Sequence, residues 1–128
     1  MKSLKLNFLF TIVMFLMLSA AFTQEKQMAS AEERATKLTG WMKTNLQLTA
    51  QQESQVQQIN LKYANKTDAV KGSQAPKMEK AKTLKANDQA KDAELKTVLT
   101  EDQFKTYQTK KNELKKQLKK EMKARQQQ

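Results

Sequence analysis

The amino-acid sequence predicts an all-α protein built from four helices. Residues with high helix propensity, mainly Ala, Lys, Gln, Glu, Leu and Met, dominate the chain after the first 23 residues. Only two glycines and one proline interrupt this part, namely Gly40, Gly72 and Pro76. No run of β-branched residues alternates with polar ones, so no strand is predicted.

Residues 1–21 are predicted to be a secretory signal peptide. After two lysines, an apolar run extends from Phe8 to Leu18 and is followed by the small residues Ser19-Ala20-Ala21. Cleavage is expected after Ala21, or as late as Thr23. The apolar run is about half as long as the roughly 20 residues that span a bilayer. We therefore expect an exported protein with no integral membrane segment after processing.

Residues 22–128 are predicted to form a single domain with a thin hydrophobic core. Leu, Ile, Val and Phe number only 14 among the 105 residues from Gln24 on. An elongated shape or a dimer is the usual remedy for so little core. The same residues include 22 basic and 13 acidic side chains, a net charge of +9. Because export removes nucleic acid as a partner, the expected partners are acidic proteins, membrane surfaces and anionic envelope polysaccharide or lipid headgroups.

The first helix is predicted from about Ala31 to Asn45. Ser30 and Glu33 have the spacing of a capping box, in which each side chain bonds the backbone N–H of the other residue. Gly40 lies inside this helix at a cost of about 1 kcal/mol. The apolar positions recur at helical spacing and are Ala31, Ala35, Leu38, Trp41, Met42 and Leu46.

The second helix is predicted from Ala50 to about Val70, and the segment Gly72–Pro76 then forms a loop. The third helix is expected from about Lys77 to Val98. The fourth is expected from about Glu101 to Arg125. Nine basic and two acidic residues lie between positions 105 and 125, so this C-terminal helix is expected to be strongly positive. The last three glutamines are expected to fray.

A pentapeptide of the form LTxxQ occurs twice, at Leu48–Gln52 and at Leu99–Gln103, and each copy opens a predicted helix. The threonine hydroxyl can accept a hydrogen bond from the backbone N–H three residues on. The glutamine side chain can reach back to the threonine N–H, and the leucine fixes the angle at which the chain enters the helix. Both copies are therefore predicted to be capping boxes.

With a signal peptide, four helices and two LTxxQ motifs about fifty residues apart, the chain resembles the LTxxQ (Spy/CpxP-like) family of periplasmic proteins from about Glu32 to Lys123. The resemblance implies a periplasmic, elongated, hairpin-like protomer that pairs into an intertwined curved dimer. It also implies ATP-independent binding of unfolded or misfolded envelope proteins on a cationic, partly apolar surface. The motif residues would then have an architectural role at the helix junctions. They are Leu48, Thr49, Gln52, Leu99, Thr100 and Gln103.

Two sets of side chains are candidates for client binding. Lysines of the fourth helix can attract acidic, unfolded chains, or they can form a solvated face that keeps the protein soluble. Methionines suit a surface that accepts many partners, although a methionine at helical spacing is more often part of a core. The candidates are Lys105, Lys110, Lys111, Lys115, Lys116, Lys119, Met42 and Met78.

No catalytic, metal-binding or cofactor site is predicted. The chain has no Cys and no His, so thiol chemistry and the commonest general base are missing. Acidic residues are expected to be helix partners of basic ones, such as Asp92 with Lys96. The remaining alternatives are a regulatory protein that docks an acidic envelope-stress sensor domain, a Skp-like basic chaperone, and a structural protein that binds an anionic envelope surface.

Overall fold

The computed structural model describes residues 29–127, so the predicted signal peptide lies outside the described residues. Four helices and no strand make up the described part, which confirms the predicted all-α fold. Their bounds differ from the predicted ones by at most two residues. None of these helices is both long and apolar enough to cross a membrane. The helices are α2 (Ala31–Leu46), α3 (Ala50–Gly72), α4 (Lys77–Val98) and α5 (Glu101–Gln126).

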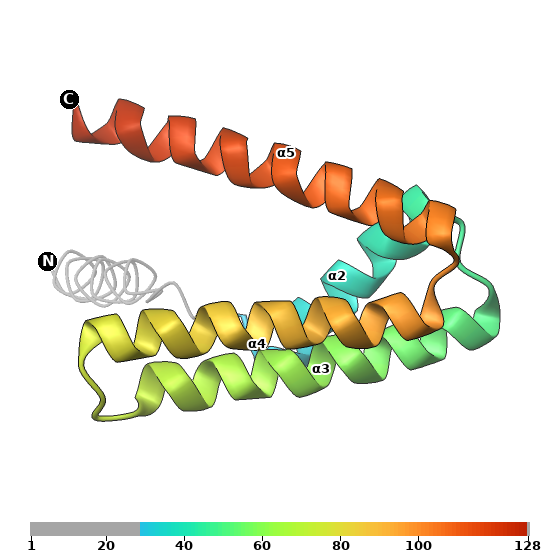
Figure 1. Cartoon of the computed structure of the whole chain (residues 1–128), viewed down its shortest axis with the longest axis horizontal. Helices are drawn as coiled ribbons and strands as arrows, with labels where there is room; N and C mark the ends of the chain where they lie inside the picture. The colour runs from blue at the N-terminus through green and yellow to red at the C-terminus, as the bar shows by residue number, and fades with distance from the viewer. Residues whose placement is uncertain (1–28, 128) are drawn as a thin grey trace, which may run out of the picture.

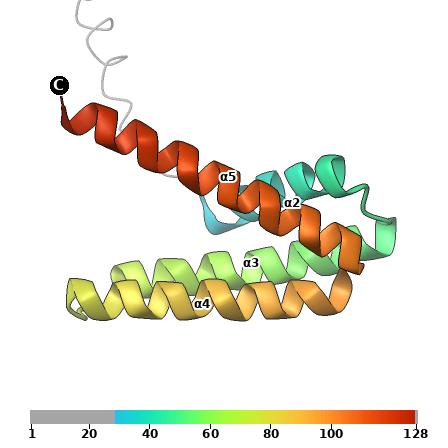
Figure 2. The ribbon, with the colours of Figure 1, turned by 45° about the horizontal axis from the view of Figure 1, so that its top comes forward.

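The helices are arranged around a long antiparallel hairpin of α3 and α4 (Figure 1). The shorter helix α2 packs against α3. Helix α5 starts at the same end of the hairpin as α3, contacts α2 and α4, and then diverges from the hairpin toward its free C-terminus (Figure 2). The molecule is therefore elongated, and its outermost helix is attached mainly at one end.

All three predicted capping boxes are present. The hydroxyl of Ser30 accepts from the N–H of Glu33, and Thr49 and Thr100 accept in the same way from the glutamines three residues on. In each case the carboxylate or amide oxygen of the third residue accepts from the backbone N–H of the cap. Helix α4 follows Pro76 and has no side-chain cap.

The hydrophobic core lies at the end of the hairpin where α2 and α4 finish and α3 and α5 begin. Leu48 and Leu99, the leucines of the two motifs, are both buried there. Met42 is fully buried in the same cluster. It is therefore a core residue, and the prediction that it contacts clients is wrong. The buried cluster consists of Met42, Leu46, Leu48, Val56, Leu95, Leu99 and Tyr107.

The two motif glutamines meet above this core and form what we call the glutamine clasp, Gln52 with Gln103. The amide nitrogen of Gln52 donates to the side-chain oxygen of Gln103 over 2.7 Å, and the reverse bond measures 3.1 Å. Each side-chain oxygen also accepts from its own cap N–H. Each amide nitrogen also donates to the carbonyl of the last residue of another helix: Gln52 donates to Val98 of α4, and Gln103 donates to Leu46 of α2.

Both amides of the clasp therefore use their full capacity of two donated and two accepted hydrogen bonds. Helix ends leave backbone groups without partners inside the helix, and the clasp supplies partners at the C-termini of α2 and α4 and the N-termini of α3 and α5. A glutamate could cap a helix equally well, as Glu33 does at α2, but it could not donate. The clasp explains why both motifs end in glutamine.

The first prediction concerns the donors of the clasp. We expect Gln103→Glu to lower the free energy of unfolding by about 2–4 kcal/mol, because two donors are lost and oxygens of Leu46 and Gln52 then face a carboxylate. Urea unfolding followed by circular dichroism measures the change. Gln108→Glu is the matched control, because it places the same charge at an exposed position of the same helix. Equal stability of the two variants would show that the clasp contributes nothing beyond capping.

Candidate functional site

The outer part of α5 is open to solvent. Phe104 and Tyr107 hold the first two turns against the body, and their ring centroids lie 6.1 Å apart. Every described residue of α5 after Lys111 is exposed. Three of these exposed residues are large and apolar and are spaced four apart, so they lie along one face of the helix. We call this row the α5 stripe; it consists of Leu114 (52% exposed), Leu118 (49%) and Met122 (63%).

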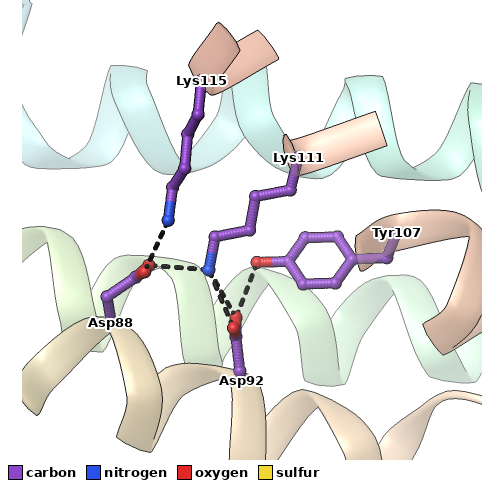
Figure 3. A network of polar contacts seen from close by, with 5 residues as sticks. All are labelled: Asp88, Asp92, Tyr107, Lys111 and Lys115. Carbon is purple, nitrogen blue, oxygen red and sulfur yellow. Dashed lines mark hydrogen bonds and ion pairs between the residues drawn. The ribbon is translucent and has the colours of Figure 1, made fainter. Parts of the chain in front are cut away.

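A polar network joins the middle of α5 to α4, and we call it the α4–α5 network (Figure 3). The Lys111 ammonium lies 2.8 Å from an oxygen of Asp92 and 2.9 Å from an oxygen of Asp88. Lys115 lies 3.1 Å from the second oxygen of Asp88. The Tyr107 hydroxyl donates to Asp92 over 3.0 Å. Among residues 29–127, no hydrogen bond or ion pair farther along α5 joins it to the hairpin.

The network changes the proton affinity of two of its members. Burial works to raise the pKa of Asp88, but hydrogen bonds from Lys111 and Lys115 and the charges of both lysines outweigh it, so the pKa lies below the usual 3.8. Burial, followed by the charge and hydrogen bond of Asp92 and the charge of Asp88, raises the pKa of the Tyr107 hydroxyl far above its usual value. At neutral pH the network therefore consists of ionised Asp88 and an un-ionised tyrosine.

A small, mainly apolar pocket lies next to the network, where α2, α4 and α5 approach one another. Its volume is about 200 Å³, and its lining residues are Leu38, Trp41, Lys91, Tyr107, Lys111 and Leu114. Leu114 belongs both to the pocket and to the α5 stripe, so the two features are continuous. Burial and the charge of Lys111 lower the pKa of Lys91, although Asp88 and Asp92 oppose this effect.

The structure separates the lysines proposed from the sequence into two groups. Lys111 is only 16% exposed, and both it and Lys115 are paired with carboxylates of α4. The remaining four form no ion pair with any residue in 29–127; they are Lys105, Lys110, Lys116 and Lys119. Met78 is 81% exposed but lies at the start of α4, at the other end of the hairpin from the core.

Sequence reasoning missed the network and the pocket. The expected pair of Asp92 with Lys96 is wrong, because Asp92 pairs with Lys111 of the next helix instead. One signal was available: Asp88 and Asp92 are spaced four apart, and so are Lys111 and Lys115. Two acidic residues on one helix face and two lysines on the next helix have the spacing that lets antiparallel neighbours pair.

A family described as Domain of unknown function (DUF4890) matches residues 20–107, more than half of the chain. The chain belongs to this family. No curated protein and no solved structure matches it. The match to DUF4890 includes both LTxxQ motifs, the glutamine clasp and the core, and it ends at Tyr107, in the second turn of α5.

The second prediction concerns how the α4–α5 network holds α5. The pKa of Asp88 is lower in the folded protein, so its stabilising contribution is complete above the usual value of 3.8 and is lost as the pH falls through the lower folded value. We expect the distance between spin labels on α4 and α5 to be narrowly distributed at neutral pH and broad in acid. The chain has no Cys, so labels at Ala90→Cys and Lys120→Cys are unique.

Asp88→Asn provides the control for this experiment. This variant should already give a broad distribution of label distances at neutral pH. The difference in distribution width between neutral and acid conditions should therefore be mostly lost. If Asp88→Asn left the narrow distribution intact, the network would not be what positions α5.

Proposed function

We propose that this protein is an ATP-independent chaperone of the bacterial periplasm that binds unfolded or misfolded envelope proteins. The single observation that carries the proposal is the α5 stripe, an exposed apolar row on a helix rich in lysine. Contiguous exposed apolar surface with a polar rim is a feature of interaction sites. Long-range attraction by the lysines would speed the capture of acidic chains.

The positions of the lysines around α5 support capture of a client in two steps. At 100° per residue, Lys115 and Lys119 flank one edge of the α5 stripe and Lys110 lies near the other. Charge would bring in the client, and the apolar row would then hold it through contacts of modest area. Because weak contacts release readily, a client could fold while bound or soon after release. No nucleotide or cofactor is needed for such a cycle.

We also propose that the chain is related to the Spy/CpxP-like LTxxQ family and forms a homodimer. The reciprocal bonds of Gln52 and Gln103 give the two motifs one shared structural role, which supports the relationship to the LTxxQ family. The thin core supports the homodimer, since a single copy buries few large apolar side chains. Export by the N-terminal segment remains part of the proposal.

The concentration of positive charge on one helix favours a second candidate, a regulator that docks one acidic sensor domain. Charge reversal separates the two functions. A regulator should lose binding sharply when one small patch is reversed, whereas a chaperone should lose activity gradually with the total positive charge.

The third prediction tests general chaperone activity. The processed chain, from Gln24 onward, should suppress the light scattering of a denatured client near equimolar ratio without ATP, and high salt should weaken the effect. Leu118→Gln should raise the concentration needed for half suppression about threefold, because an apolar contact with the client is lost.

Ala124→Gln is the matched control for Leu118→Gln. It also replaces an exposed apolar residue of α5 by glutamine, but it lies off the α5 stripe and should change suppression little. Unchanged scattering at several-fold excess over several unrelated clients would rule out a general chaperone and would leave the single-partner regulator as the better account.

A further inference from the structure

Lys91 is the unusual member of the pocket formed by α2, α4 and α5. Its side chain is partly buried and lines a pocket whose other walls include Leu38, Trp41 and Leu114. It forms no ion pair and no hydrogen bond with any residue in 29–127, although most other partly buried charges there are paired. A buried charge without a partner is costly, so a cation in such a position suits a ligand that supplies the missing anion.

We propose that this pocket binds one apolar side chain, preferably aromatic, of an extended polypeptide and that Lys91 pairs with a carboxylate beside it in that polypeptide. The inference rests on the proposed function, because it names the kind of segment that the chaperone recognises. The recognised unit would be an aromatic residue next to Asp or Glu.

The local charges support an anionic partner. Three lysines, Lys91, Lys111 and Lys115, surround two carboxylates, Asp88 and Asp92. The two carboxylates are occupied by Lys111 and Lys115 and by the Tyr107 hydroxyl. One positive charge is therefore left over at the pocket, and Lys91 carries it.

The size of the pocket favours a single side chain over a larger ligand. Cavities of about 150 Å³ bind benzene, whereas sites for drug-sized molecules enclose about 300–1,000 Å³. The volume of about 200 Å³ thus fits one aromatic ring with its first connecting atoms. Trp41 and Tyr107 are among the residues that line the pocket, and aromatic rings pack favourably against one another.

Continuity with the α5 stripe favours a polypeptide over a free small molecule. Leu114 lines the pocket and also begins the exposed row that continues to Leu118 and Met122. A chain anchored in the pocket could therefore run along α5 beside Lys115 and Lys119. Lys91 also borders a second hollow of about 290 Å³ between α2, α3 and α4, which includes Arg34 and Asp88. The second hollow lacks Trp41, so a signal from Trp41 tells the two apart.

The test uses the fluorescence of Trp41, the only tryptophan of the chain. Peptides of about ten residues without tryptophan are titrated into the processed chain, one containing Phe-Asp, one Phe-Asn and one Ala-Asp. We expect the Phe-Asp peptide to shift the emission saturably. The other two peptides should bind about tenfold more weakly, since each lacks one of the two recognised groups.

Two variants locate the interaction. Lys91→Gln should weaken binding of the Phe-Asp peptide about tenfold and leave the Phe-Asn peptide unchanged. Lys82→Gln, at an exposed position of the same helix, makes the same change in net charge and should alter the binding of neither peptide. Circular dichroism checks that both variants fold. The comparison of Phe-Asp with Phe-Asn on the unaltered chain needs no variant, so a failure of Lys91→Gln to fold leaves the test intact.

Three results would overturn the inference. One is equal binding of the Phe-Asp and Phe-Asn peptides, and another is equal weakening by Lys91→Gln and Lys82→Gln. The third is tighter, Lys91-dependent binding of octanoate than of the Phe-Asp peptide, which would make the pocket a site for a small amphiphilic carboxylate.

The inference and the proposed function can fail separately. If the chain suppresses aggregation but the Phe-Asp peptide leaves Trp41 unchanged, the chaperone proposal stands and the pocket is not its recognition site. If the peptides bind as expected but no client is protected, the pocket recognises such segments and general chaperone activity is wrong.

Discussion

The reciprocal hydrogen bonds between Gln52 and Gln103 are the constraint on which the rest of the structure depends. They join residues fifty-one positions apart, and the same two side chains also bond backbone groups at one end of each described helix. With few large apolar residues available, the protein gathers them at this one junction, where Leu48 and Leu99 are buried. Specific polar bonds and a small core therefore act at the same place and fix the angles at which the helices leave it.

Because the contacts are concentrated at one end, α5 beyond Lys115 is exposed. The helix is held by Phe104 and Tyr107 near the clasp and by ion pairs of Lys111 and Lys115 farther out. Partly exposed ion pairs contribute modestly and are weakened by salt and acid. An arm attached in this way can change its angle to the hairpin at small cost, which would suit the proposed binding of clients of different shapes.

The parts of this structure that depend on local chemistry were predictable from the sequence. The helices, their ends and all three capping boxes follow from residues at most four positions apart. Contacts between distant segments were not predictable in the same way. Nothing local indicates that Gln52 bonds Gln103, and helical spacing alone does not decide whether Met42 faces the core or whether Asp92 pairs with Lys96 or Lys111. Each of these outcomes depends on how the helices pack. The pocket at Lys91 exists only because the three helices α2, α4 and α5 meet there.

Hydrogen exchange along the backbone tests the central claim most directly. The account predicts that amides near the clasp, within about 52–60 and 95–107, exchange slowest. Amides of α5 beyond Lys115 should exchange at least about a hundredfold faster, because only local helix opening protects them. The measurement is made without client and at low protein concentration. Protection that is uniform along α5 to its last turn, or weakest at the clasp, would contradict the account.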